Sequence, residues 1–184
     1  MEKITEQLYV SEYIYPLADK VNPILRPFIK KLIQKNKLFI TDPHKPRQIT
    51  AKMTGWHITS REIEQLVEWV SFLIIRDFEK ANGHLLKCSE VWGIVFNKGD
   101  SIEGHTHVPS VYSFVYYVDA PKGSSSLVFE TSGHRIEAEK GKMIIFDSRL
   151  THKVTPNSSK NRCALSGNFI NKDNTGAYQV PGNY

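Results

Sequence analysis

The sequence of 184 residues contains only two cysteines, Cys88 and Cys163, and no C-x-x-C pair. Two such distant cysteines supply neither a disulfide framework nor a zinc knuckle, so we expect two free thiols in a reducing cytoplasm. No stretch approaches the roughly 18 apolar residues of a membrane span, and the N-terminus is polar rather than signal-like. We therefore expect a soluble cytoplasmic protein without a membrane segment.

Strong charge of one sign, internal repeats and low-complexity tracts are also absent. The 24 basic and 19 acidic residues give a net charge of +5, which is mildly basic. Such a balance keeps an anionic partner open but is explained as well by solvated helix faces. No Ser-His-Asp or paired-carboxylate set is evident, so hydrolytic chemistry of those types is not indicated.

The order of patterns predicts a mainly β fold with a helical N-terminal part, in one domain of residues 1–184. Residues 1–89 have helical character and are expected to support the core and form the substrate side. Residues 90–170 consist of short strands, and residues 171–184 form a polar, irregular tail. Several even strands after helices imply a compact sandwich or barrel.

A first helix is predicted around Ile24–Ile33, where apolar residues recur at steps of three and four. Pro23 and Pro27 leave its first residue open, because proline favours the first turn of a helix. The segment Thr41–Trp56 follows, and its Pro, Lys and Thr content predicts a loop or a strand.

A second helix has a clearer signature. Thr59 and Glu62 match a capping box, and Gly83 suits the end of the helix. Between them one apolar stripe at helical spacing is expected to pack on a sheet. The stripe consists of Ile63, Leu66, Val67, Val70, Leu73, Ile74 and Phe78.

Six strands are predicted after residue 90, separated by short turns rich in Gly, Pro, Asn and Ser. The strands are Val91–Phe96, Val111–Val118, Leu127–Glu130, Arg135–Ala138, Lys142–Phe146 and Cys163–Ile170. The turns are Asn97–Asp100, Pro121–Ser124, Ser132–Gly133 and Lys140–Gly141.

Three histidines form the candidate metal site. His105 and His107 are two residues apart, so on extended chain both side chains point to one face and can bind the same metal. His152 is the candidate third ligand from a distant strand. Three protein ligands leave coordination positions open, which is typical of catalytic rather than structural sites. The remaining histidines, His44, His57, His84 and His134, are expected to be ordinary surface or loop residues.

The order of these parts resembles the Fe(II)/2-oxoglutarate-dependent dioxygenases, in particular the prolyl-hydroxylase-like branch and its small phage-encoded and bacterial members. The resemblance covers about residues 90–170. It rests on the runs Val95-Phe96-Asn97-Lys98-Gly99-Asp100, His105-Thr106-His107, Ser113-Phe114-Val115-Tyr116-Tyr117, Gly141-Lys142-Met143-Ile144-Ile145-Phe146-Asp147, His152-Lys153-Val154 and Arg162 to Asn168. It implies a double-stranded β-helix (jelly-roll, cupin-like) core with supporting helices, and the reactants Fe(II), 2-oxoglutarate and O2.

The sequence departs from that family at His107, where an aspartate is usual. A neutral imidazole there makes the site similar to the three-histidine sites of cupin-type dioxygenases. Glu103 and Asp100 lie close enough in sequence to supply a carboxylate in place of His107. We expect His105, His107 and His152 to be the metal ligands, with these two carboxylates as alternatives.

The second carboxylate of 2-oxoglutarate needs a cation, and arginine meets a carboxylate with two hydrogen bonds. Arg162 is the candidate. Strand alternation places Arg162, Ala164, Ser166 and Asn168 on one face, so the Ser166 hydroxyl can add a contact. By resemblance Tyr117 corresponds to the tyrosine that binds the same carboxylate, although packing in the core explains it too. Trp56 and Trp92 are expected either in the core or at the substrate entrance.

The sequence therefore predicts an oxygenase that hydroxylates a C–H bond and releases succinate and CO2. Its substrate is expected to be a protein residue or a small molecule, with nucleic acid as a weaker alternative. Two other classes fit the same residues. One is a cupin-like three-histidine metalloenzyme that does not use 2-oxoglutarate, and the other is a non-catalytic β-sandwich binding module. A phage-encoded chain would act in the host cytoplasm.

Overall fold

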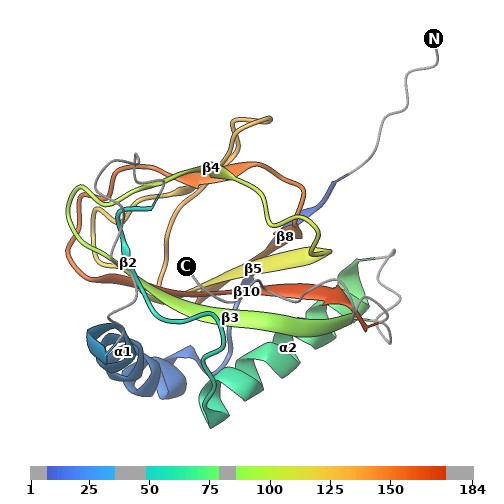
Figure 1. Ribbon diagram of the computed structural model, residues 1–184, viewed down its shortest axis with the longest axis horizontal. Coiled ribbons are helices and arrows are strands. Elements are labelled where there is room, and N and C mark those ends of the chain that lie inside the picture. Colours follow the sequence, from blue (N-terminus) through green and yellow to red (C-terminus); the bar gives the residue numbers. More distant parts are fainter. Residues whose placement is uncertain (1–7, 36–48, 79–85, 173–184) are drawn as a thin grey trace.

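The computed structural model describes residues 8–35, 49–78 and 86–172, and within them two helices and ten strands (Figure 1). The helices are α1 (Ala18–Lys35) and α2 (Arg61–Asp77). The strands are β1 (Val10–Ile14), β2 (Lys52–Met53), β3 (Leu86–Phe96), β4 (Ile102–His105), β5 (Tyr112–Asp119), β6 (Leu127–Phe129), β7 (Arg135–Ile136), β8 (Lys142–Asp147), β9 (His152–Val154) and β10 (Arg162–Asn171). Neither helix combines the length and the apolar character needed to cross a membrane.

The strands form two antiparallel sheets. The larger sheet has the order β1-β8-β5-β10-β3-β2, and the smaller sheet has the order β4-β9-β6-β7. From β3 to β10 the chain crosses repeatedly from one sheet to the other, which is the winding of a double-stranded β-helix. Both helices lie on the outer face of the larger sheet (Figure 1). The predicted mainly β fold with a helical N-terminal part is confirmed.

Helix α1 packs through one stripe, in which Val21, Leu25 and Ile29 are buried at steps of four residues. Ile24 was predicted in this stripe, but its side chain is 51% exposed. The helix begins at Ala18, before both Pro23 and Pro27. The two prolines are exposed, so the backbone hydrogen bonds that they remove lie on the solvent side, where water can replace them.

Helix α2 begins one residue later than the predicted capping box implies. Its N-cap is Ser60, whose hydroxyl accepts a hydrogen bond from the Ile63 N–H at 3.4 Å. The Thr59 hydroxyl instead donates to the Glu64 carboxylate at 2.9 Å, so the Thr59 cap is wrong. The helix ends at Asp77, and Gly83 lies outside the described residues. Of the predicted apolar stripe, all members except half-buried Val67 are buried.

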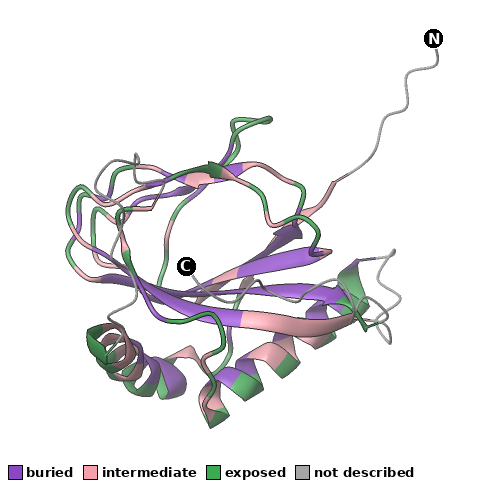
Figure 2. Cartoon of the chain, viewed as in Figure 1, coloured by how far each residue is buried: buried purple, intermediate pink, exposed green. Residues whose placement is uncertain are grey.

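Two apolar cores lie on opposite faces of the larger sheet, whose strands are buried over much of their length (Figure 2). The first fills the space between the helices and the sheet, and the second lies between the two sheets. Alternation along the strands separates them: Phe114 and Tyr116 of β5 belong to the first core, whereas Tyr117 belongs to the second. In the same way, Leu165 of β10 faces the helices and Ala164 faces the other sheet.

All six predicted strands are present, with ends shifted by a few residues. Three strands were missed, β1, β4 and β9, whereas β2 lies within the segment 41–56, for which a loop or a strand was predicted. The four predicted turns contain Gly99, Gly123, Gly133 and Gly141, and each of these glycines has a positive φ.

Candidate metal centre

Three histidines converge where β4 and β9 pair. His105 ends β4 and lies opposite His152, the first residue of β9, across the antiparallel ladder. His107 lies in the loop after β4, and its N–H donates to the Ser148 carbonyl at 2.9 Å. The ring centroids are 4.4 to 5.1 Å apart, and the nitrogens that could bind a metal all lie within 4.8 Å of one another. The structure thus brings together the three predicted side chains.

Backbone carbonyls fix the orientation of two of these rings. His105 Nδ1 lies 2.9 Å from the Glu103 carbonyl oxygen, and His152 Nδ1 lies 2.8 Å from the Leu150 carbonyl oxygen. A carbonyl oxygen only accepts hydrogen bonds, so Nδ1 must carry the proton in each ring. The lone pair then resides on Nε2, which is the arrangement that prepares an imidazole to bind a metal.

Burial keeps two of the three rings, His107 and His152, uncharged at neutral pH. It lowers the pKa of His107 to about 3, and the neighbouring rings of His152 and His105 lower it further. Burial also lowers the pKa of His152 to about 4, with His105 adding to the effect and the hydrogen bond to Leu150 opposing it. Both rings are therefore neutral at pH 7, the state in which imidazole binds metals.

The two carboxylates considered as alternative ligands lie elsewhere. Glu103 is exposed, and its contact with the histidines is through its backbone carbonyl. Asp100 accepts a hydrogen bond from the Asn97 N–H at 2.7 Å and so stabilises the turn before β4. Among the described residues, no carboxylate or thiol joins the group of three histidines.

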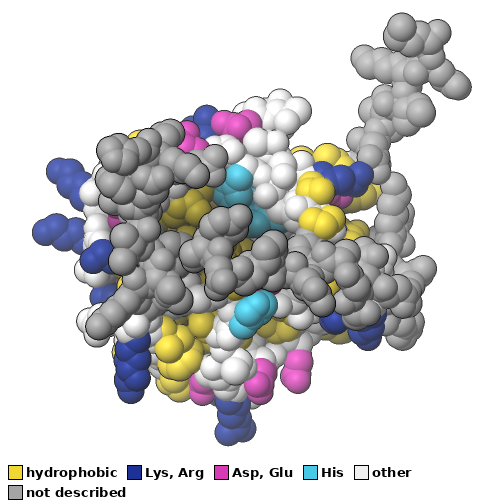
Figure 3. Space-filling view, viewed as in Figure 1, with side chains coloured by type: hydrophobic (Ala, Val, Ile, Leu, Met, Phe, Trp, Pro, Cys, Tyr) yellow, Lys and Arg dark blue, Asp and Glu magenta, His cyan; other side chains and the backbone are white. Residues whose placement is uncertain are grey.

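A cavity of about 340 Å³ opens beside the histidines and runs between the two sheets. Histidine side chains are visible among hydrophobic ones near the middle of the molecular face in Figure 3. All three histidines line the cavity, together with Trp56 and Trp92. The two helices contribute no lining residue, whereas the described part of the 41–56 segment contributes Ile49, Met53 and Trp56.

Arg162 lines one end of this cavity and is almost completely buried, with 1% exposure. Its guanidinium carbon lies 4.3 Å from the Phe96 ring centroid and 4.9 Å from that of Tyr117. Its Nε and Nη1 are buried and have no hydrogen-bond partner among the described residues. Burial lowers the pKa of Arg162, yet a guanidinium stays charged in proteins. A buried cation with unused donors requires an anion.

Tyr117 and Ser166 lie near this arginine in different ways. The Tyr117 hydroxyl is fully buried and, like Nε and Nη1 of Arg162, has no hydrogen-bond partner within the described part of the chain. Burial raises the pKa of Tyr117, and the nearby Arg162 opposes that rise. Ser166 lines the cavity with Arg162, Ala164 and Asn168, as strand alternation predicts. Tyr117 contacts the guanidinium but does not line the cavity itself.

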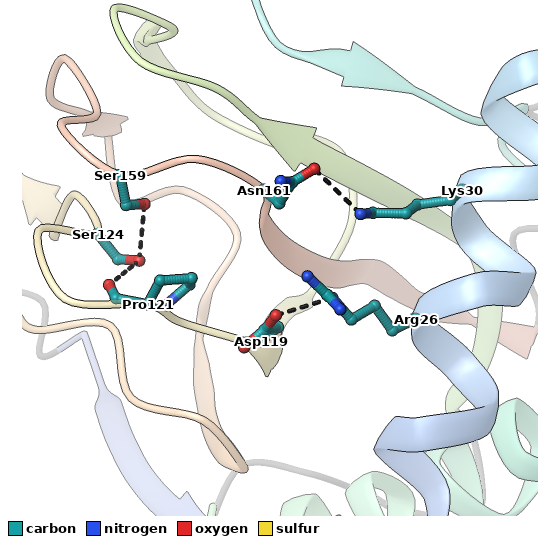
Figure 4. Close-up of polar contacts among 7 residues, drawn as sticks. All are labelled: Arg26, Lys30, Asp119, Pro121, Ser124, Ser159 and Asn161. Atoms are coloured by element: carbon teal, nitrogen blue, oxygen red, sulfur yellow. Dashed lines mark hydrogen bonds and ion pairs between the residues drawn. The ribbon is translucent and has the colours of Figure 1, made fainter.

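Helix α1 contacts the ends of the two strands that carry these groups. Lys30 Nζ donates to the Asn161 side-chain oxygen at 3.0 Å, and Asn161 directly precedes Arg162 (Figure 4). Arg26 forms an ion pair of 2.8 Å with Asp119, the last residue of β5, two positions after Tyr117 (Figure 4). The helix therefore fixes both strand ends from the outer face of the sheet.

Sequence reasoning missed a polar group at the other end of the cavity. Glu90 lines the cavity and accepts a hydrogen bond of 2.8 Å from the Asn168 side-chain nitrogen. The buried hydroxyls of Ser113 and Ser148 continue this network. The signal was present, because Glu90 lies two residues before Trp92 and so shares its face of β3, but no motif marks it. The exposed positions of His57 and His134 confirm the expectation for them, while His44 and His84 lie outside the described residues.

One protein-family model, described as "Putative 2OG-Fe(II) oxygenase", matches residues 90–139. The matched segment contains His105 and His107, whereas His152 and Arg162 follow it. No curated protein matches the chain. The matched family is defined by iron and 2-oxoglutarate, which agrees with the predicted cofactor and co-substrate.

Solved structures with the same fold support this family match. The viral collagen prolyl hydroxylase of Paramecium bursaria Chlorella virus-1, solved with 2-oxoglutarate, has a TM-score of 0.65 and 17% identity over 88% of this chain and 95% of its own. A Pseudomonas putida prolyl-4-hydroxylase has a TM-score of 0.64 and 18% identity over 88% and 92%. A 2OG-Fe(II) oxygenase-family protein of Burkholderia pseudomallei has a TM-score of 0.60 and 12% identity over 89% and 88%.

These similarities confirm the predicted resemblance to oxygenases of the prolyl-hydroxylase type. The family model over residues 90–139 is that of 2-oxoglutarate-dependent oxygenases, whose reactants are Fe(II), 2-oxoglutarate and O2, and the solved structures share the fold of this chain. One of the three neighbours is viral and two are bacterial, so they give no support to a phage origin.

Proposed function

We propose that this chain, an oxygenase of the prolyl-hydroxylase type by family match and fold, uses His105, His107 and His152 to hold Fe(II) and Arg162 to hold 2-oxoglutarate. In the proposed reaction one oxygen atom of O2 enters a substrate C–H bond as a hydroxyl group, and the other enters succinate as 2-oxoglutarate loses CO2. The observation that carries the proposal is the three-histidine cluster beside a cavity that ends at the buried guanidinium of Arg162, whose Nε and Nη1 lack partners among the described residues.

The three histidines fit Fe(II) by the chemistry of their donor atoms. His105 and His152 offer Nε2 with their Nδ1 protons already bound to carbonyl groups, and the pKa values of His107 and His152 keep both rings neutral. Bound iron would supply the redox chemistry that activates O2. The histidines themselves hold and orient the metal, since the Nδ1 protons of His105 and His152 are already bound to backbone carbonyl groups.

Arg162 fits the far carboxylate of 2-oxoglutarate. Its Nε and Nη1 are both buried and free to donate, and a guanidinium can meet a carboxylate with two hydrogen bonds. The Tyr117 hydroxyl, also buried and unpartnered among the described residues, is a third donor for the same group. Ser166, farther along β10 on the cavity wall, can contact the dianion between its two ends. The rings of Phe96 and Tyr117 hold the guanidinium in place.

For the substrate we infer a protein residue or a small molecule. One structural neighbour is a collagen prolyl hydroxylase, and that protein's substrate class favours a protein residue here. A nucleic-acid site would present several cations along a groove. Apart from the histidines, the lining residues in the described part of the chain carry one cation, Arg162, and one anion, Glu90. This lining is therefore poorly suited to a polyanion and better suited to a group that enters between apolar walls.

The test is an anaerobic titration of the Fe(II)-loaded protein with 2-oxoglutarate, followed by visible absorbance. A keto acid bound to ferrous iron gives a weak charge-transfer band. We expect the band in the wild type, its loss in His152→Ala, and a lower affinity for 2-oxoglutarate in Arg162→Ala. Removing a charge-assisted hydrogen-bond pair costs about 2–3 kcal/mol, or roughly 30- to 150-fold in Kd.

His134→Ala and Arg135→Ala are matched controls, because both side chains are exposed and neither lines the cavity. Both variants should behave as the wild type. Stoichiometric iron without a band, together with activity that survives Arg162→Ala, would favour a cupin-like three-histidine enzyme. No bound metal in any condition would favour a non-catalytic binding module and contradict the proposal.

A further inference from the structure

The cavity has opposite charges at its two ends. Strands β3 and β10 pair along it, with Phe96 opposite Arg162 and Glu90 opposite Asn168. The side chains between these pairs alternate toward the cavity, so its wall runs from a guanidinium to a carboxylate along β10. The proposed co-substrate accounts for Arg162, but it leaves Glu90 without a role.

A directed chain of hydrogen bonds ends at Glu90. Ser113 Oγ donates to the Asn168 side-chain oxygen at 2.8 Å, and Asn168 Nδ2 donates to Glu90 Oε2 at 2.8 Å. Ser113 has only one hydroxyl proton, so in its contact of 2.8 Å with Ser148 it is Ser148 that donates. All three donors are at most 5% exposed. The chain fixes one carboxylate oxygen, and no described residue donates to the other, which is available to a ligand.

Aromatic surface adjoins this carboxylate. Trp92, two residues from Glu90 on the same side of β3, lies 5.7 Å from His107 between ring centroids and 4.9 Å from Trp56. The Trp92 Nε1 is buried and has no hydrogen-bond partner among the described residues. Trp56 is 42% exposed at the cavity. Indole faces next to a carboxylate are the surroundings in which proteins bind organic cations.

We propose that the substrate carries a cationic nitrogen, an ammonium or guanidinium group, which pairs with Glu90 beside Trp92 and Trp56. This inference rests on the proposed function and specifies its substrate class. Two residues along a strand span about 7 Å. Glu90 therefore lies about that far along β3 from Trp92, whose ring centroid is 5.7 Å from that of His107. This separation between Glu90 and the histidine cluster places the reacting carbon several bonds from the charged nitrogen, as in the side chain of lysine or arginine.

A purely structural role for Glu90 is the alternative. The hydrogen-bond chain that ends at Glu90 would then only hold the loop that carries His107, because the Ser148 carbonyl also accepts the His107 N–H. The substitution Glu90→Gln separates the two roles. Its amide oxygen can still accept from Asn168 Nδ2, so the hydrogen-bond chain is retained while the charge is lost. A purely structural Glu90 would tolerate this change, whereas a cation-binding Glu90 would not.

The experiment measures ligand binding by tryptophan fluorescence in metal-free protein. A Trp69→Phe background removes the indole of α2 and leaves Trp56 and Trp92 as reporters. The probes are N-acetyl-lysine amide and N-acetyl-arginine amide, each against its neutral counterpart made from norleucine or citrulline. We expect at least one cationic probe to bind about tenfold or more tightly than its counterpart. Glu90→Gln should abolish this preference without changing the affinity for the neutral probe.

Glu139→Gln is the matched control, since it removes an exposed carboxylate outside the cavity and should keep the preference. n-Butylamine carries the ammonium group of lysine without the flanking amides. Binding as tight as that of N-acetyl-lysine amide would indicate a small amine as the substrate, whereas weaker binding would indicate a residue within a peptide. Equal binding of charged and neutral probes, a preference that survives Glu90→Gln, or no saturable binding of either cation would overturn the inference. Because this assay needs neither iron nor turnover, its failure is separable from failure of the absorbance test.

Discussion

Arg162 shows most directly how a single side chain indicates an absent ligand. The strand places it beside two aromatic rings, with 1% exposure and with two nitrogens lacking partners in the described part of the protein. Leaving a charged group in this state costs several kcal/mol, which ordinary folding would avoid. The cost is offset only when an anion enters, and this is why the cavity end is suited to a dicarboxylate.

The two thiols are expected to be unreactive at neutral pH. Burial raises the pKa of Cys88 and of Cys163 to about 12, so at pH 8 only about one thiol in ten thousand is a thiolate. We predict that neither is alkylated by iodoacetamide in the native protein, whereas both react within minutes in urea. Mass spectrometry of the labelled chain would measure this. Rapid native labelling of Cys88, the more exposed of the two, would contradict the prediction.

Residues of the candidate site could be predicted from sequence where they stand in a recognisable order. The short spacing of His105 and His107, and the later His152 and Arg162, supplied that order. Glu90 could not be predicted this way, because a glutamate in a strand is usually an exposed residue on the solvent face. Its position becomes informative only when the pairing of β3 with β10 places it opposite Asn168.

At the level of elements, long and regular patterns were predicted well and short ones were not. Strands β4 and β9 have four and three residues, and polar histidines occupy their paired ends. Apolar alternation, the main sequence signal for a strand, is absent from such segments. Strand β1 was missed because its partner β8 lies far away in the sequence. The first residue of α2 was misplaced for a different reason: adjacent Thr59 and Ser60 are both good capping residues, and the sequence does not decide between them.

The turn before β10 offers a test of how α1 positions Arg162. Asn161 has φ of 62°, a left-handed conformation that asparagine and glycine tolerate better than alanine. We predict that Asn161→Ala destabilises the protein by about 1–2 kcal/mol and weakens 2-oxoglutarate binding. Urea unfolding and the absorbance titration would measure the two effects.

Asn161→Gly is the comparison variant, because it accepts the same backbone conformation but loses the contact with Lys30. A weaker 2-oxoglutarate affinity in this variant, at nearly unchanged stability, would assign a positioning role to the Lys30 contact. If Asn161→Ala were as stable as the wild type, the backbone argument would be wrong.

For the whole molecule, a bound metal should act as a crosslink. His105 and His152 belong to the smaller sheet, and the loop of His107 is held by Ser148, which follows β8 of the larger sheet. A ligand present at a hundred times its Kd stabilises the native state by about 2.7 kcal/mol. We predict that anaerobic Fe(II) raises the Tm by about 5–10 °C and that a chelator reverses the rise.

Differential scanning fluorimetry with and without the metal would measure this shift. His152→Ala should abolish the shift, and His134→Ala should retain it, because His134 is exposed and outside the cluster. An equal shift in His152→Ala would mean that iron binds elsewhere on the protein.

The separation of the two cores by one sheet has a practical consequence for engineering. Neighbouring residues of β10 serve different purposes: Leu165 anchors the helices, whereas Ala164 and Ser166 line the cavity. A mutational library confined to the even-numbered positions 164 and 166 would vary the chemistry that the cavity accepts while leaving the packing of helices on the sheet untouched. We expect new substrate preferences to be reachable along this strand without first adding stabilising mutations elsewhere.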